Sequence, residues 1–204
     1  MSAWLGAIVL AAGKSRRMGT CKQLLPLGDG IVITRCLETL ARGGIDEVVV
    51  VVSEGETDIV EALRGYPVRI VVNPDSEGDM ASSVRAGRDA LPAGVRGVIV
   101  FPCDCPLVSA DTVHRLIAGH QNSPGSIVIP CHGGRRGHPL LFPRTILNEL
   151  TGDNNLRDLV RRDAGRVVCL DLDDPGVLID MDTPEDYQRI REMIQSTDHK
   201  GVQP

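Results

Sequence analysis

The chain is 204 residues long, with 42% hydrophobic, 24% charged and only 2% aromatic residues. These proportions are typical of a globular protein and argue against a disordered chain, a collagen-like repeat and a coiled coil. The formal net charge of −5 disfavours a general nucleic-acid-binding protein, which usually carries a basic surface. The length predicts a single domain over residues 1–204, with a polar, frayed tail over residues 196–204.

No apolar run reaches the roughly 18–20 residues that span a bilayer. The longest run, residues 5–12, is too short and has no basic segment before it, so it does not resemble a signal peptide. We therefore expect a cytoplasmic protein without membrane contact. In that compartment the six scattered cysteines are expected to be reduced.

Short β-branched runs alternate with helical patterns along the chain. The runs are typical of strands buried on both faces and cover residues 7–11, 48–52, 68–72, 97–101 and 126–129. The helical patterns cover residues 33–41, 57–63, 82–91, 109–117, 155–162 and 184–194. Ser82, Ser109 and Thr183 are candidate N-cap residues. The alternation predicts an α/β fold of three layers, in which helices cover both faces of a mostly parallel sheet.

The segment after the first strand combines glycine with positive charge. Residues 13–19 read Gly-Lys-Ser-Arg-Arg-Met-Gly, and Lys22 follows. Glycine lets backbone N–H groups approach phosphates, while lysine and arginine neutralise them. A P-loop would need glycine in place of Ile8, and the interval from Gly13 to Gly19 is too long for the dinucleotide fingerprint, which weakens a nicotinamide-dependent oxidoreductase. A solvated basic turn is the alternative interpretation.

Acidic residues follow the fourth strand and recur late in the chain. Asp104 stands between two cysteines and two prolines, and hard cations such as Mg²⁺ prefer carboxylate oxygens. The alternation in Asp180-Met181-Asp182 puts both carboxylates on one side of an extended segment, where one or both can reach a metal held by Asp104. Helix capping and N-terminal helix charge are the alternative for this pair. A zinc site is weaker still, because the Cys-x-Cys spacing is poor for zinc. That site would use Cys103, Cys105, Cys131, His132 and His138.

Two further segments follow predicted strands. Asn73 comes after the third strand, and Ser82 and Ser83 lie where a helix N-terminus would present hydroxyl and N–H groups to a nucleobase or an anion. Plain helix capping is the alternative for these serines. Residues 131–139, after the fifth strand, hold two histidines and two arginines among three glycines. This composition favours a positively charged loop over a binding site.

Together these motifs resemble those of nucleotidyltransferases of the molybdenum cofactor guanylyl- and cytidylyltransferase type. The resemblance covers residues 7 to about 190 and implies a Rossmann-like, nucleotidyltransferase-type fold. Ala-Ala-Gly and Gly-His-Pro are similar to the cytidylyltransferase branch. The motifs are Leu10-Ala11-Ala12-Gly13-x-Ser15-x-Arg17-Met18-Gly19-x-x-Lys22, Cys103-Asp104-Cys105-Pro106, Gly137-His138-Pro139 and Asp182-Thr183-Pro184-Glu185-Asp186.

The resemblance also implies a role for each matching position. The implied catalytic residues are Lys22, Arg17 and Asp104, and the implied ligands of Mg²⁺ are Asp104 and Asp182. The implied nucleotide-binding residues are Leu10, Ala11, Ala12, Gly13, Ser15, Arg17, Lys22, Asn73, Ser82 and Ser83. The implied acceptor-binding residues are Gly137, His138, Asn155 and Arg157. Asn155 stands where the family pattern Gly-Asp-x-Gly-x-Arg has glycine, so this chain departs from the pattern on the acceptor side.

The implied reaction transfers a nucleoside monophosphate, CMP from CTP as the first hypothesis, to a phosphorylated acceptor of molybdopterin type and releases pyrophosphate. Two polyanions must meet, and two unit charges at 4 Å repel by roughly 4 kcal/mol at an effective dielectric of 20. Mg²⁺ and the cationic side chains offset this repulsion. Another base, a sugar or polyol phosphate acceptor, and a nucleotide-binding partner of molybdoenzymes without turnover stay open as alternatives. Transient contact with a molybdoenzyme is a further implied interaction.

Overall fold

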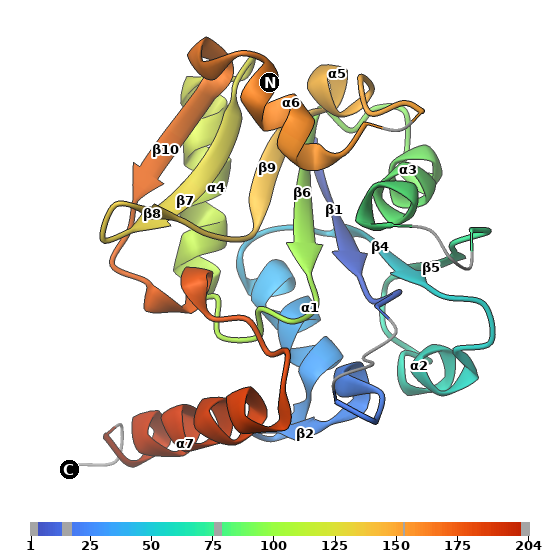
Figure 1. The fold of residues 1–204 in the computed structure, drawn as a ribbon, viewed down its shortest axis with the longest axis vertical. Helices are drawn as coiled ribbons and strands as arrows, with labels where there is room; N and C mark the ends of the chain where they lie inside the picture. The colour runs from blue at the N-terminus through green and yellow to red at the C-terminus, as the bar shows by residue number, and fades with distance from the viewer. Residues whose placement is uncertain (1–3, 14–17, 76–78, 153, 201–204) are drawn as a thin grey trace.

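The computed structural model describes residues 4–13, 18–75, 79–152 and 154–200. Among these residues, eight strands form one sheet in the order β10-β7-β9-β6-β1-β4-β5, with β8 paired to β7 (Figure 1). A separate pair consists of β2 and β3. The strands of the large sheet are β1 (Leu5–Leu10), β4 (Glu47–Val52), β5 (Arg69–Val72), β6 (Gly97–Pro102), β7 (Ile127–His132), β8 (Arg135–Arg136), β9 (Leu140–Pro143) and β10 (Val167–Asp171). The small pair is β2 (Pro26–Leu27) and β3 (Gly30–Ile31).

The helices surround this sheet (Figure 1). The α-helices are α1 (Val32–Arg42), α2 (Thr57–Ala62), α3 (Met80–Ala90), α4 (Ala110–Asn122), α5 (Arg144–Leu147), α6 (Leu156–Arg162) and α7 (Pro184–Lys200). Three 3₁₀ helices are described: η1 (Lys22–Leu24), η2 (Ala164–Arg166) and η3 (Pro175–Leu178). No helix of the described segments is long and apolar enough to cross a bilayer.

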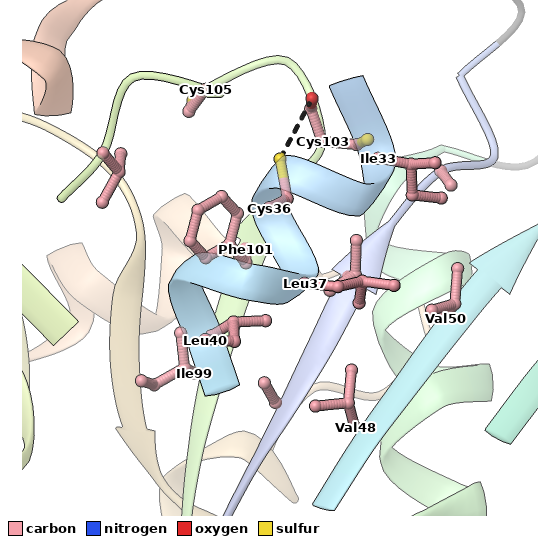
Figure 2. Close-up of a cluster of buried hydrophobic side chains, with 14 of the residues drawn as sticks. Ile33, Cys36, Leu37, Leu40, Val48, Val50, Ile99, Phe101, Cys103 and Cys105 are labelled. Atoms are coloured by element: carbon pink, nitrogen blue, oxygen red, sulfur yellow. Dashed lines mark hydrogen bonds between the residues drawn. The ribbon is translucent and has the colours of Figure 1, made fainter. Parts of the chain in front are cut away.

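Two apolar clusters, one on each face of the sheet, form the core. Alternate residues of a strand enter opposite clusters: Val48 and Val50 of β4 join one, while Val49 and Val51 join the other. The first cluster takes its helical side chains mainly from α1 and α4, and the second from α3, α5 and α6. Figure 2 shows α1 packed on the first face, with Cys36 beside Phe101. The three-layer α/β fold predicted from the sequence is therefore confirmed.

Every strand and helix expected from the sequence is present, with boundaries shifted by a few residues. The strand β9 was not predicted, and it pairs antiparallel with β6. It is only four residues long and ends at Pro143, a composition that resembles a loop. The edge strand β10 was also missed: four of its five residues are apolar, but so short a run cannot be told from a buried helical segment by periodicity alone.

Two helix ends differ from the predictions. The N-cap of α3 is Asp79, whose carboxylate accepts a hydrogen bond from Ser82 N at 3.0 Å, so Ser82 lies in the first turn instead of at the cap. Aspartate caps as well as serine, and a start three residues earlier adds most of a turn. The expected tail from residue 196 is helical as far as Lys200, because residues 195–200 contain neither glycine nor proline. The expected cap Ser109 does accept a hydrogen bond from Thr112 N.

Candidate active site

The connection order of the sheet reverses next to β1, which pairs parallel with β4 on one side and with β6 on the other. Ligands of open α/β sheets bind beyond the carboxyl ends of the strands at such a point. The segments that leave this end are residues 11–13 after β1 and residues 103–105 after β6. A third segment joins them, because Met181 N donates to Asp104 O at 2.8 Å. Three parts of the chain that are distant in sequence thus meet at the carboxyl ends of the central strands β1 and β6.

Lys22 links the two acids that the sequence predicted as metal ligands. Its Nζ lies 3.0 Å from Asp104 Oδ2 and 3.2 Å from Asp182 Oδ1, and it donates to Met181 O at 3.0 Å. Only 10% of the Lys22 side chain is exposed. Burial lowers the pKa of Lys22, but the carboxylates of Asp104 and Asp182 outweigh it, so the pKa lies above its ordinary value. The ammonium group therefore stays charged between two carboxylates that are themselves partly open to solvent.

A third carboxylate lies beside this group. Oxygen atoms of Asp104 and Asp180 and the thiol of Cys105 lie within 4.8 Å of one another. Cys105 Sγ donates to Asp180 Oδ1 at 3.2 Å. Burial, together with the charges of Asp104 and Asp180, raises the pKa of Cys105 well above its ordinary value, so the thiol keeps its proton. The donors offered to a cation are therefore carboxylate oxygens, the set that a hard divalent ion prefers.

The carboxylates of Asp104 and Asp182 accommodate a cationic group, since the Lys22 ammonium lies against both. Asp180 adds a further carboxylate beside Asp104, and this donor set fits a divalent ion. The zinc alternative does not fit. In the described part of the chain, Cys131, His132 and His138 do not group with Cys103 or Cys105. Cys103 and Cys105 are almost completely buried and pack as small apolar residues in the first cluster.

The residues predicted to lie near the base form a buried polar cluster at the start of α3. Asn73 Nδ2 donates to Ser82 Oγ at 2.8 Å and to Ser83 Oγ at 3.0 Å. Ser82 Oγ in turn donates to Asp79 O at 2.8 Å. Asn73 thus ties the end of β5 to the first turn of α3. Ser15 and Arg17, the other predicted nucleotide ligands in the basic segment, lie outside the described residues.

The predicted acceptor residues lie in two separate places. Gly137 N donates to Pro130 O and His138 N donates to Val177 O, each at 2.8 Å, so the backbone of this loop is held between β7 and η3. Asn155 is the N-cap of α6 and Arg157 is exposed on the same helix. No hydrogen bond between described residues joins Asn155 or Arg157 to the Lys22 group. The predicted acceptor residues therefore come from two elements, the loop after β7 and α6, and their binding role stays a prediction.

Two residues that the sequence did not single out touch the segment after β1. Gln23 Nε2 donates to Ala11 O at 2.9 Å and to Gly13 O at 3.3 Å, and Ser53 Oγ donates to Ala12 O at 2.7 Å. Ser53 directly follows β4, so the rule that places ligands beyond the carboxyl ends of strands could have found it. Gln23 does not follow a strand, so no sequence rule points to it apart from its position next to Lys22.

Residues 7–167 match the family model described as the MobA-like NTP transferase domain. The chain belongs to this family. Two relatives are 31% identical: nicotine blue oxidoreductase of Paenarthrobacter nicotinovorans, over 90% of this chain and 94% of that protein, and purine catabolism protein PucB of Bacillus subtilis, over 93% and 97%. Molybdenum cofactor guanylyltransferase of Shewanella loihica and molybdenum cofactor cytidylyltransferase of Escherichia coli are each 26% identical, over 95% and 92% of this chain and 99% and 96% of theirs. The resemblance stated from the sequence motifs is confirmed.

Solved structures give the same family. A nucleotidyl transferase from Methanothermobacter thermautotroptrophicus is 29% identical, with a TM-score of 0.83 over 95% of this chain and 98% of that one. The structure of Rv0371C from Mycobacterium tuberculosis in complex with manganese is 25% identical, with a TM-score of 0.76 over 94% of this chain and 100% of that one. This chain is therefore a nucleotidyltransferase-family protein in both sequence and fold.

Proposed function

We propose that the protein is a single-domain, divalent-metal-dependent enzyme that transfers CMP from CTP to a phosphorylated acceptor of molybdopterin type and releases pyrophosphate. The observation that carries the proposal is the contact of Lys22 with Asp104 and Asp182 at the carboxyl ends of β1 and β6. Cation and carboxylates lie side by side there, beside the glycine-containing bend after β1. That is the combination that a triphosphate with its divalent ion requires.

In this reaction a phosphate oxygen of the acceptor attacks the α-phosphorus of the nucleotide in line, and the bond to pyrophosphate breaks. The nucleophile is already an anion, so no strong general base is needed. Lys22 supplies a fixed positive charge for the phosphates, because its side chain is buried and its ammonium group is held in place. Asp104 and Asp182, with Asp180 beside them, would hold the divalent ion, which neutralises phosphate charge when bound. Rv0371C, which is 25% identical to this chain, was solved in complex with manganese, which supports the use of a divalent ion.

The choice of CTP rests on sequence motifs. The guanylyltransferase and the cytidylyltransferase relatives are equally identical to this chain, so overall identity does not separate GTP from CTP. The Ala11-Ala12-Gly13 and Gly137-His138-Pro139 segments resemble the cytidylyltransferase branch and favour CTP. The phosphorylated pterin acceptor follows from the same resemblance, and a sugar or polyol phosphate is the alternative.

Pyrophosphate release tests the proposal. The protein is incubated with Mg²⁺ and each of CTP, GTP, ATP and UTP, with and without a molybdopterin-type acceptor. We expect release only with the acceptor, and fastest with CTP. Release with a sugar or polyol phosphate instead would change the acceptor, while binding of a nucleotide without release under every condition would favour a non-catalytic partner of molybdoenzymes.

An oxidoreductase is the second candidate, because one of the two 31% identical relatives bears that name. The sequence lacks the glycine fingerprint of dinucleotide-binding folds, which argues against a bound nicotinamide cofactor. The two candidates separate in one experiment. Thermal-shift measurements compare CTP, GTP, NADH and NADPH, since a ligand that binds only the folded state raises the melting temperature. Stabilisation by a reduced nicotinamide nucleotide alone would overturn the transferase proposal.

A further inference from the structure

The bend after β1 is anchored by side chains through three successive carbonyl groups. The carbonyl oxygens of Ala11 and Gly13 accept hydrogen bonds from Gln23 Nε2, and that of Ala12 accepts one from Ser53 Oγ. The two donors come from different parts of the chain. Gln23 belongs to η1, whereas Ser53 follows β4. The bend is therefore fixed from two sides.

These bonds also orient the N–H groups of the bend. A trans peptide is planar, and its N–H points away from its C=O. The carbonyl of Ala11 shares a peptide with the N–H of Ala12, and the carbonyl of Ala12 shares one with the N–H of Gly13. Gln23 is 2% exposed, so the carbonyls of Ala11 and Gly13, which it bonds, face the protein interior, whereas the carbonyl of Ala12 faces Ser53. The N–H of Ala12, opposite the carbonyl of Ala11, consequently points away from Gln23, to the outer side of the bend, where Ala12 is half-buried.

We propose that Gln23 and Ser53 are positioning residues, which fix the Ala11–Gly13 bend so that the N–H of Ala12 meets an oxygen atom of the nucleoside triphosphate. The inference rests on the proposed function and adds two residues to that site. A backbone N–H group forms a strong hydrogen bond with an anionic oxygen. Donors held in place before binding need no reorganisation when the ligand arrives, which strengthens binding.

The position of Gln23 gives the arrangement a second consequence. Gln23 and Lys22 are neighbours on η1, yet their side chains reach different partners. Lys22 contacts Asp104 and Asp182, while Gln23 contacts the bend. One short helix therefore sets the distance between the bend and the carboxylates of Asp104 and Asp182. A triphosphate with its divalent ion needs both features at a fixed separation.

Ser53 offers the sharper test, because its side chain is half-buried and can be changed with little effect on packing. Ser53→Ala removes the hydroxyl, and Ser53→Thr keeps it. The dissociation constants of CTP and GTP with Mg²⁺ are measured by calorimetry, with melting temperatures of the unliganded proteins. We expect Ser53→Ala to weaken binding of the preferred nucleotide about threefold to tenfold, the usual effect of one hydrogen bond, and Ser53→Thr to restore it. Ser123→Ala, a half-buried serine at the end of α4, is the matched control.

Gln23→Glu tests the other anchor. The change keeps the shape of the side chain but replaces the donor Nε2 with an oxygen, which then faces the carbonyl oxygens of Ala11 and Gly13. We expect a larger loss of nucleotide affinity than in Ser53→Ala, with the KM of the acceptor unchanged. Gln121→Glu, on the exposed side of α4, makes the same change in charge and serves as control. If Gln23→Glu does not fold, the Ser53 pair still decides.

The outcomes separate the inference from the proposed function. Wild-type protein that binds neither nucleotide would overturn the proposed function. Wild-type protein that binds a nucleotide while Ser53→Ala binds it equally well would overturn the inference alone. A lower melting temperature of Ser53→Ala with unchanged nucleotide affinity would also overturn it, because the hydroxyl would then have a purely structural role.

Discussion

The two halves of the sheet hold their candidate site residues in different ways. In the half formed by β6, β1, β4 and β5, side chains bond across the crevice: Lys22 to Asp104 and Asp182, Gln23 and Ser53 to the bend. In the half formed by β10, β7 and β9, the loop after β7 is held by backbone bonds, and its two arginines are exposed. The first half therefore fixes several polar side chains in advance, whereas the second holds its loop by the backbone and by His132, whose Nδ1 lies 2.8 Å from Leu172 O. The exposed side chains of Arg135 and Arg136 can therefore be changed without disturbing the backbone bonds that hold the loop.

The largest effect is expected from Asp104→Ala in the first half. The Asp104 carboxylate contacts Lys22, and its backbone carbonyl accepts a hydrogen bond from Met181 N. Asp104 also belongs both to the pair with Asp182 and to the pair with Asp180. Loss of this carboxylate should lower turnover by roughly 10²–10³-fold, the scale of removing a fixed electrostatic group. Pyrophosphate release with CTP, Mg²⁺ and the molybdopterin-type acceptor measures it. Asp173→Ala, an exposed acid that follows β10 in the second half, is the control. Full activity of Asp104→Ala would remove Asp104 from the mechanism.

The second largest effect is expected from Gly137→Ala, which disturbs the backbone path of the loop after β7 in the second half. A Cβ at Gly137 would collide with the backbone carbonyl of Val177. Gly137→Ala should therefore push the loop away from η3 and lower the free energy of unfolding by about 1–3 kcal/mol. Chemical denaturation measures the loss. Gly125→Ala is the matched control, because a Cβ there meets no atom within 4 Å. Equal stability of the two variants would show that the second half is not held by its backbone.

The same contrast explains how far the sequence could predict this molecule. Strands such as Val48–Val52 are apolar on both faces, and the rule for the carboxyl ends of strands led to Asp104. The family resemblance implied that Asp104 shares a site with Asp182 and Lys22. The strand Leu140–Pro143 was missed because so short a run ending in proline resembles a loop, and its antiparallel pairing with β6 is decided by tertiary contacts. The bonds of Gln23 depend on where η1 lies, which no local pattern specifies. The roles of these residues in catalysis stay predictions.

A smaller effect is expected at Asn155, for which sequence and structure suggest different roles. Its side chain accepts a hydrogen bond from Asp158 N at 3.1 Å, and Asp158 Oδ2 accepts one from Asn155 N at 3.0 Å. Asn155→Ala should cost about 1 kcal/mol of stability, and Asn155→Ser should restore it because serine also caps helices. Denaturation and the KM of the acceptor are measured together. A raised acceptor KM in the stable Asn155→Ser variant would instead support the predicted binding role of the amide.

The smallest expected effect lies between the two halves, at His120. This residue of α4 is 2% exposed, a Cβ at Gly97 of β6 would collide with its ring, and its Nδ1 has no hydrogen-bond partner among the described residues. Burial lowers the pKa of His120, so the folded state favours the neutral ring. As pH falls through about 6.5, the unfolded chain binds a proton that the folded protein does not, and stability decreases.

The decrease continues with falling pH until the lower pKa of the folded state is reached, and above the unfolded pKa the stability is fully present. His120→Gln removes the titrating group, so the loss of stability between about pH 7.5 and about pH 5.5 should be smaller than in the wild type. Urea denaturation at several pH values measures both slopes. His114→Gln on the same helix is the control, because His114 is exposed. Parallel slopes for wild type and His120→Gln would mean that the junction of the two halves accepts a charged ring, and that the burial of this imidazole does not oppose its protonation.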